Sequence, residues 1–169
     1  MRILGVSGSL QRGSSNLALL ECARELAPTG VEVAIYDGLR TLPQFNLDLE
    51  AQAPLPLVEA WRRELDASDA LLLASPEYGF SLPGALKNAI DWVIGSGELE
   101  RKVVGITASV NHTERGRRGL AALENTLSAL SATVVGGVPI VRGAEFENDV
   151  RVLLGALIGA AQAARSSGA

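Results

Sequence analysis

The sequence has 169 residues, the size of about one domain, and we expect a single domain over residues 1–169. Hydrophobic residues make up 47% and charged residues 20%, a balance that supports a substantial core and excludes a disordered chain. The net charge is −4, and the only basic cluster is Arg115, Arg117 and Arg118. A protein dedicated to binding nucleic acid is therefore not expected.

Metal, membrane and export signals are weak in this sequence. One cysteine, Cys22, and one histidine, His112, are too few for a disulfide or a zinc site, so we expect no metal. The first apolar run, Ile3–Val6, is far shorter than the core of a secretion signal, which favours the cytoplasm. The apolar stretch Val152–Ala164 is too short to cross a membrane and predicts a buried helix.

The fold class follows from an alternation of two patterns. Segments with apolar residues at helical spacing separate five short, almost continuously apolar runs of the kind found in parallel sheets. These runs are Arg2–Val6, Val31–Tyr36, Ala70–Ala74, Val103–Ala108 and Thr133–Val141. We therefore predict an α/β fold: a doubly wound, five-stranded parallel sheet of flavodoxin-like order 2-1-3-4-5 with helices on both faces.

Sheets of this kind bind ligands at the carboxyl ends of their strands. Three loops are predicted there, namely Ser7–Ser15, Ser75–Leu82 and Ser109–Gly116. The stretch Gly38–Pro56 has no clear periodicity and predicts a surface loop that borders the site.

The first of these loops, within Gly5–Asn16, is rich in glycine and serine and lies between a strand and a helix. Its backbone N–H groups, the hydroxyls of Ser9, Ser14 and Ser15, and the positive end of the helix dipole predict a site for an anion. The alternative is an ordinary turn in which Ser14 or Ser15 caps the helix.

Known phosphate and nucleophile motifs do not match this loop. Gly8 and Gly13 have the spacing of a P-loop, but Ser14 stands where that motif requires lysine. The dinucleotide pattern G-x-G-x-x-G is absent, and Ser9 stands where a nucleophile elbow requires glycine. The ligand class that remains for this loop is a phosphate monoester bound without metal.

Two motifs point to a family. The first is G-S-L-x-x-x-S-x-N from Gly8 to Asn16, and the second is P-E-Y-x-x-x-x-P-G-x-L-K-N-x-x-D-W from Pro76 to Trp92. Together they resemble the NADPH-dependent FMN reductase family, whose strand and helix pattern the chain follows from Met1 to Arg165. The resemblance implies non-covalent FMN and electron transfer from NAD(P)H to a small-molecule acceptor such as a quinone, a flavin, an azo dye or an oxidised metal ion.

The resemblance also implies which residues hold FMN. No residue is expected to act as a catalytic acid or base, because the flavin itself carries the hydride chemistry. His112 is accordingly interpreted as a solvated loop residue. The implied phosphate contacts are Ser9, Ser14, Ser15 and Asn16, and the implied ring contacts are Pro76, Glu77, Tyr78, Gly79, Phe80 and Ser109.

Two positions depart from the family pattern. Members usually have arginine where this chain has Gln11, and the neighbouring Arg12 is the other candidate for the phosphate contact. Many members have asparagine in place of Gly79, a mild change because both residues tolerate positive φ.

The helix expected over residues 83–94 has an apolar arc wider than one-sided burial requires. This arc favours a homodimer or homotetramer through that helix, and the alternative is that neighbouring helices of the same chain cover it. Two other functions stay open at this point: a flavodoxin-type electron carrier, and a scaffold of the same fold without a cofactor.

Overall fold

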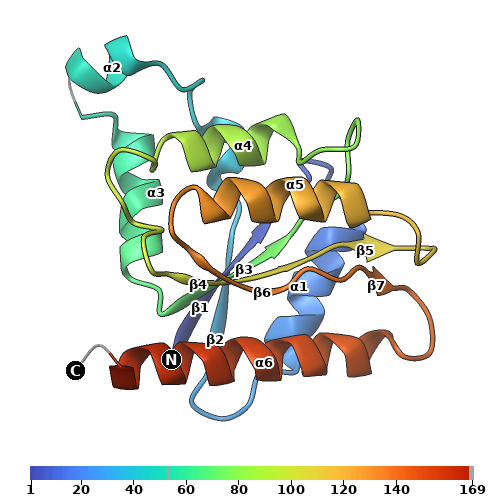
Figure 1. The fold of residues 1–169 in the computed structure, drawn as a ribbon. Coiled ribbons are helices and arrows are strands. Elements are labelled where there is room, and N and C mark those ends of the chain that lie inside the picture. The colour runs from blue at the N-terminus through green and yellow to red at the C-terminus, as the bar shows by residue number, and fades with distance from the viewer. Residues whose placement is uncertain (53, 168–169) are drawn as a thin grey trace.

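The computed structural model describes residues 1–52 and 54–167, so three residues of the domain predicted over 1–169 lie outside the description. In the described part, strands form a central parallel sheet and helices cover both of its faces (Figure 1). The carboxyl ends of the strands lie toward the right-hand side of that view.

The strands of the central sheet are β1 (Arg2–Ser7), β2 (Glu32–Tyr36), β3 (Ala70–Ala74), β4 (Val103–Thr107) and β6 (Thr133–Gly136). A separate two-stranded sheet consists of β5 (Ser109–Val110) and β7 (Ile140–Val141). The helices are α1 (Ser15–Glu25), α2 (Leu47–Gln52), α3 (Pro56–Asp66), α4 (Gly84–Asp91), α5 (Arg117–Ser128) and α6 (Phe146–Ser167), with a short 3₁₀ helix η1 (Gly38–Thr41).

The order of the central sheet is β2-β1-β3-β4-β6, which confirms the predicted 2-1-3-4-5 arrangement. Ser7 of β1 pairs with Ala74 of β3, and Ala74 pairs with Thr107 of β4, so these three strands end level with one another. The hydrogen bonds continue into the loops, since the N–H of Gly8 donates to Ala74 O and that of Ser75 to Thr107 O, both at 2.9 Å. Three loops therefore begin side by side.

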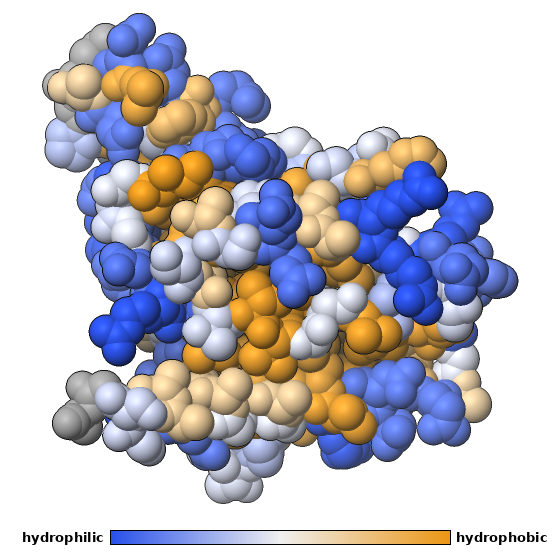
Figure 2. Space-filling model, in the orientation of Figure 1, coloured by the Kyte–Doolittle hydropathy of each residue, from blue (hydrophilic) through white to orange (hydrophobic). Residues whose placement is uncertain are grey.

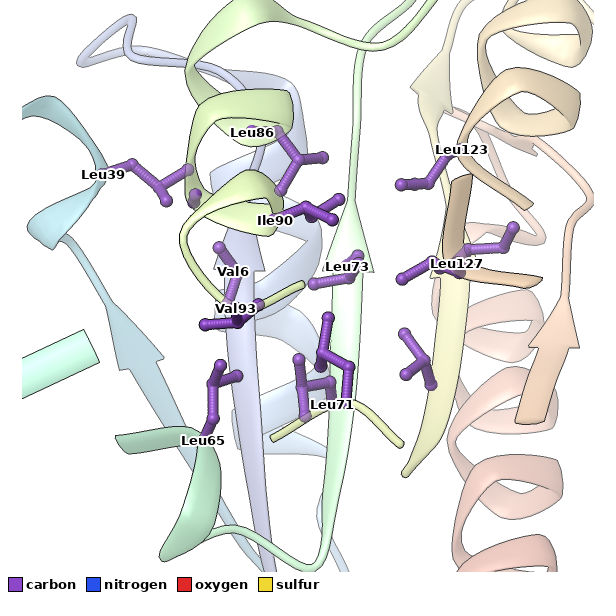
Figure 3. Close-up of a cluster of buried hydrophobic side chains, with 14 of the residues drawn as sticks. Val6, Leu39, Leu65, Leu71, Leu73, Leu86, Ile90, Val93, Leu123 and Leu127 are labelled. Carbon is purple, nitrogen blue, oxygen red and sulfur yellow. The ribbon is translucent and has the colours of Figure 1, made fainter. Parts of the chain in front are cut away.

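Alternation along the central strands separates the core into two layers. Leu71 and Leu73 of β3 pack with α3, α4 and α5, where Leu86 and Leu123 are buried (Figure 3). Leu72 faces the opposite way, into the cluster that α1 and α6 cover. Because β3 is buried on both faces, it has no polar residue.

The fifth strand is interrupted, contrary to the continuous run predicted over Thr133–Val141. Gly136, the last residue of β6, and Gly137 have φ of 88° and 87°, a left-handed conformation beyond which the extended strand does not continue. The chain leaves the central sheet at this point, and β7 pairs with β5 instead. The predicted strand thus supplies one strand to each sheet.

Two further predictions need correction. The stretch Gly38–Pro56, predicted as a loop, contains η1 and α2, and its residue 53 lies outside the description. The C-terminal helix is longer than Val152–Ala164 and is buried along one face only, with Val152 65% exposed. No helix in the described ranges has the length and apolarity needed to cross a bilayer.

The wide apolar arc of α4 and the residues after it is covered within the chain. Trp92 and Val93 are buried, and Trp92 Nε1 donates to Pro43 O at 2.8 Å. Asn88 Nδ2 donates to the same carbonyl at 2.9 Å, and the ring of Phe45 packs edge-on against Trp92. Coverage by other segments of the same chain therefore explains the wide apolar arc. The arc no longer supports an interface between subunits.

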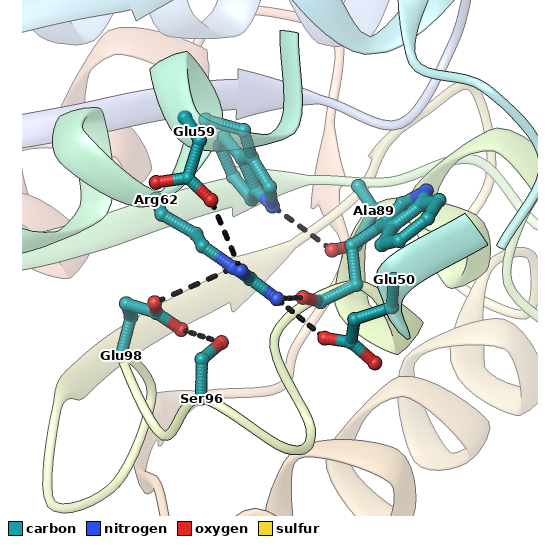
Figure 4. Close-up of polar contacts among 8 residues, drawn as sticks. Glu50, Glu59, Arg62, Ala89, Ser96 and Glu98 are labelled. Atoms are coloured by element: carbon teal, nitrogen blue, oxygen red, sulfur yellow. Dashed lines mark hydrogen bonds and ion pairs between the residues drawn. The ribbon is translucent and has the colours of Figure 1, made fainter. Parts of the chain in front are cut away.

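A cationic side chain ties α2 and α3 to the turn after α4 (Figure 4). Arg62 contacts Glu50 at 2.7 Å, Glu59 at 3.1 Å and Glu98 at 3.7 Å, and it also donates to Trp92 O at 2.9 Å. Burial lowers the pKa of Arg62, but its hydrogen bonds and the neighbouring carboxylates raise it more, so the net pKa is above the usual value. The guanidinium is held as a cation among three anions.

Replacing Arg62 with alanine should lower the free energy of unfolding by roughly 1–3 kcal/mol, because three carboxylates then lie together without their cation. Urea denaturation measures this loss. Arg63→Ala is the matched control, since Arg63 is exposed on the same helix, and it should change stability by less than about 0.5 kcal/mol. Equal losses in the two variants would show that the cluster contributes nothing specific.

Candidate active site

The first loop presents hydroxyl groups at the start of α1. Ser14 is the N-cap of this helix, and its Oγ accepts the N–H of Asn16 at 3.2 Å. Ser9 Oγ accepts the N–H of Gln11 at 3.3 Å. Both oxygens act as acceptors in these bonds, so both hydroxyl protons stay available to a ligand.

Backbone donors accompany these hydroxyls. Within the described part of the chain, the N–H groups of Arg12, Gly13 and Ser15 donate to no protein acceptor. They lie at the N-terminus of an 11-residue helix, where the dipole favours negative charge. The loop therefore combines capping by Ser14 with the donor set predicted for an anion.

A buried amide joins the first loop to the third. Asn16 Oδ1 accepts the backbone N–H of Ser109 at 2.9 Å, and the hydroxyl of Ser15 lies 3.4 Å from Ser109 O. Asn16 is only 4% exposed. The side chains of Ser15 and Asn16, predicted as phosphate contacts, thus bind protein atoms here and fix the start of β5 against α1.

A pocket of about 480 Å³ lies between the second and third loops, within the range of ligand sites. Ser109 lines it and is 8% exposed, and its hydroxyl has no hydrogen-bond partner among the described residues. A buried unpaired hydroxyl is uncommon in proteins and marks a place where a ligand can supply the partner. The residues predicted for the flavin ring that line this pocket are Pro76, Glu77, Phe80 and Ser109.

The tip of the second loop is a tight turn. Tyr78 and Ser81 exchange two backbone hydrogen bonds of 3.0 Å, and the residues between them, Gly79 and Phe80, have φ of 57° and 62°. Positive φ at both central positions is typical of a type I′ turn, and it explains the glycine. Tyr78 and Gly79 are exposed at the tip and do not line the pocket.

Glu77 has a contact that the sequence did not reveal. Its Oε2 accepts the N–H of Gly119 at 2.8 Å, in the first turn of α5. A Cβ added at Gly119 would lie 2.9 Å from Glu77 Cβ, so only glycine allows this approach. Glu77 therefore caps α5 and holds the second loop against it, and its contact with a cofactor stays a prediction.

Gln11 and Arg12, the two candidates for a phosphate contact, are both exposed. They line a different pocket, of about 240 Å³, between the first loop and the end of β2, together with Ser9 and Tyr36. Burial, aided by the charges of Glu64 and Asp37, raises the pKa of Tyr36 above its ordinary value. Neither residue lines the larger pocket.

Sequence reasoning missed the charged part of the larger pocket. Arg115 and Arg142 line it, and Arg118 lies over the ring of Phe80 with 4.2 Å to the centroid. The cluster Arg115, Arg117 and Arg118 was noted only as the one basic group in an acidic chain and was given no role, and Arg142 gave no signal because it belongs to no motif. His112 is exposed in the third loop, as interpreted, and does not line the pocket.

Comparison with known proteins identifies close relatives. The model of the family NADPH-dependent FMN reductase matches residues 1–145. An NAD(P)H-dependent FMN reductase of Pseudomonas aeruginosa is 41% identical over 72% of this chain and 64% of its own length. An NAD(P)H:quinone oxidoreductase of Solanum tuberosum is 44% identical over 54% of this chain and 49% of its own length. The chain thus spans about half to two thirds of these two relatives.

A quinone reductase of Escherichia coli is 30% identical over 94% of this chain and 85% of its own length. Among solved structures, the flavoenzyme NAD(P)H:(acceptor) oxidoreductase FerB of Paracoccus denitrificans superposes with a TM-score of 0.79. It is 24% identical and covers 98% of this chain and 97% of its own. This likeness supports the fold.

Gly119→Ala should force the second loop away from α5, because the new methyl group would meet the Cα and Cβ of Glu77. We expect a loss of roughly 1–3 kcal/mol in stability and weaker binding of FMN. Gly159→Ala is the control, since a Cβ at that helical glycine meets nothing within 4 Å and should stabilise by up to about 1 kcal/mol. Thermal unfolding and FMN titration of both variants measure the difference, and a harmless Gly119→Ala would contradict the contact.

Proposed function

The chain belongs to the NADPH-dependent FMN reductase family, and on this premise we propose that it is an FMN-dependent NAD(P)H oxidoreductase. It would transfer a hydride from NAD(P)H through FMN to quinones, flavins or similar small molecules. The observation that carries this proposal is the pocket lined by Ser109, whose buried hydroxyl has no partner, beside a helix N-terminus with free N–H groups.

The residues present fit FMN. The N–H groups of Arg12, Gly13 and Ser15 and the free hydroxyl protons of Ser9 and Ser14 are donors suited to a terminal phosphate. Pro76 and Ser109 line a pocket suited to the flat ring. No second nucleotide motif is present in the sequence to hold an adenosine, which favours FMN over FAD.

When bound, FMN supplies the hydride chemistry. The chain binds the cofactor through the first loop and orients it between the second and third loops. Glu77 keeps the second loop in place by capping α5, and Asn16 keeps the third loop in place through Ser109. No side chain of the pocket is required to move a proton, so the protein acts by positioning and by excluding water.

The alternatives receive less support. A flavodoxin-type electron carrier has the same fold, but the relatives of this chain are named as an FMN reductase, a quinone oxidoreductase and a quinone reductase. A scaffold without a cofactor leaves the free donors of the first loop and the hydroxyl of Ser109 unexplained. Location in the cytoplasm, a single domain, and assembly as a homodimer or homotetramer stay predictions.

The purified protein should be yellow, release FMN rather than FAD on denaturation, and oxidise NADPH with a quinone in ping-pong kinetics. Ping-pong kinetics are expected because NAD(P)H and acceptor use the same pocket in turn. Chromatography of the released flavin and steady-state rates at varied concentrations of both substrates measure this. FAD as the main flavin, or intersecting double-reciprocal plots, would count against a single FMN site.

Ser109→Ala should have opposite effects on the two forms of the protein. Without FMN it should stabilise slightly or be neutral, because it removes a buried hydroxyl that has no partner. With FMN it should weaken binding by about three- to tenfold, the value of one neutral hydrogen bond. Thermal unfolding of the apo-protein measures the change in stability, and fluorescence titration with FMN measures the change in affinity. Unchanged affinity would remove Ser109 from the site.

A further inference from the structure

A cation of the short helix η1 reaches the first loop. Arg40 Nη2 donates to the carbonyl oxygen of Leu10 at 3.1 Å, across 30 positions of the sequence. Leu10 lies between Ser9 and Gln11, and the hydroxyl of Ser9 accepts the N–H of Gln11 at 3.3 Å. Arg40 therefore contacts the middle of a turn that carries a donor suited to the phosphate of FMN.

Arg40 extends from a closely packed base. Its neighbour Leu39 is buried in the core, with 4% of its surface exposed. Gly38 packs so closely on Tyr36 that an added Cβ would lie 2.3 Å from the hydroxyl oxygen of Tyr36. The Tyr36 ring in turn packs against the ring of Trp61, with 4.8 Å between centroids. The backbone of η1 is therefore held in place beside the first loop.

The guanidinium of Arg40 is available to an anion. It is exposed and forms no ion pair with any residue of the ranges 1–52 and 54–167. Within those ranges it donates to a neutral carbonyl, which leaves its other N–H donors free. A cation without an anionic partner, beside a loop with free N–H groups, suits a ligand that brings the negative charge.

The pocket beside the first loop has a positive balance of charge. Arg12, Arg40 and Asp37 line this pocket of about 240 Å³, so two cations against one anion leave a charge of +1. The N-terminus of the 11-residue helix α1 adds positive potential from the same loop. Both contributions favour a dianionic phosphate over a neutral group.

The larger pocket does not have this balance. Figure 2 shows strongly hydrophilic side chains gathered at the end of the molecule where β5 and the first turn of α5 lie. Arg115 and Arg142 line the larger pocket, but Glu77 and Glu114 line it as well, so the formal charges cancel. The positive potential is therefore specific to the first loop and to η1.

We infer that Arg40 is a specificity-determining residue that makes this chain bind FMN in preference to riboflavin. The inference rests on the proposed function and gives η1 a part in the selection of the cofactor. FMN and riboflavin differ only in the terminal phosphate, so a cation beside the first loop stabilises bound FMN and leaves riboflavin unaffected. An effect on loop shape alone, through the bond to Leu10 O, would instead change the binding of both flavins alike.

The first experiment titrates the apo-protein with FMN and with riboflavin and follows the quenching of flavin fluorescence. Arg40→Gln should weaken FMN binding by about fivefold and riboflavin binding by less than about twofold. Raising the salt concentration from about 50 mM to about 500 mM should narrow the fivefold difference, because salt screens exposed charges. Arg24→Gln, an exposed arginine in the last turn of α1, is the matched control and should change neither affinity.

The second experiment restores the charge. Arg40→Lys keeps the cation and should bind FMN within about twofold of the unmodified protein. Gln11→Arg combined with Arg40→Gln places a cation next to Leu10 and should recover most of the lost affinity. The melting temperature of the apo-protein should shift by less than about 2 °C in every variant, because both positions are exposed.

Three results would overturn the inference: no loss for FMN in Arg40→Gln, equal losses for FMN and riboflavin, or a loss that neither Arg40→Lys nor Gln11→Arg recovers. Failure of the proposed function is read separately. It would appear in the unmodified protein as absence of FMN binding or of NAD(P)H oxidation, whereas failure of the inference would leave both intact.

Discussion

The hydrogen bond from the N–H of Ser109 to Asn16 Oδ1 is the contact on which the candidate site depends. It joins residues 93 positions apart in the sequence, and Asn16 is buried, so water does not compete for the bond. On one side of it lie the donors of the first loop, and on the other lies the pocket of the third loop. Loss of this bond would leave a buried amide unpaired and separate the two halves of the site.

A second constraint comes from α5, which acts on both sides of the pocket. Its first turn receives the carboxylate of Glu77, and Arg118 of the same turn lies over Phe80. The second loop is therefore held at two points by one helix, although the turn at its tip is exposed and has a non-glycine residue at positive φ. A strained turn of this kind persists only where its surroundings hold it.

Much of the fold could be predicted because strand and helix patterns are local. Continuous apolar runs such as Ala70–Ala74 identify buried strands directly, and their alternation with helices permits few topologies. The break at Gly136 and Gly137 was missed because their neighbours are apolar and β-branched. The burial of the helix α4 was misjudged because the covering segment, around Pro43, has no periodicity of its own.

The site was predictable only where a motif carried it. The loop residues were located by their glycine and serine content and by the second motif. The hydrogen-bond partners of those residues were not predicted from the sequence. Glu77 pairs with Gly119 and Asn16 with Ser109 because of how distant loops meet in the fold. Arg142 was missed for the same reason: it reaches the pocket only because β7 leaves the central sheet.

The separation of β5 and β7 from the central sheet has a consequence for evolution. Ser109 and Val110 of β5 and Arg142 directly after β7 line the pocket, and in the described part of the chain these two strands pair with each other rather than with the five main strands. Changes at distant, independent sites combine almost additively in stability. Ser109, Val110 and Ile140 of these strands are buried, whereas Arg142 after β7 and Asn111 in the third loop are exposed. A new specificity is therefore best sought at these two positions of the pocket wall, which can change while the scaffold stays the same.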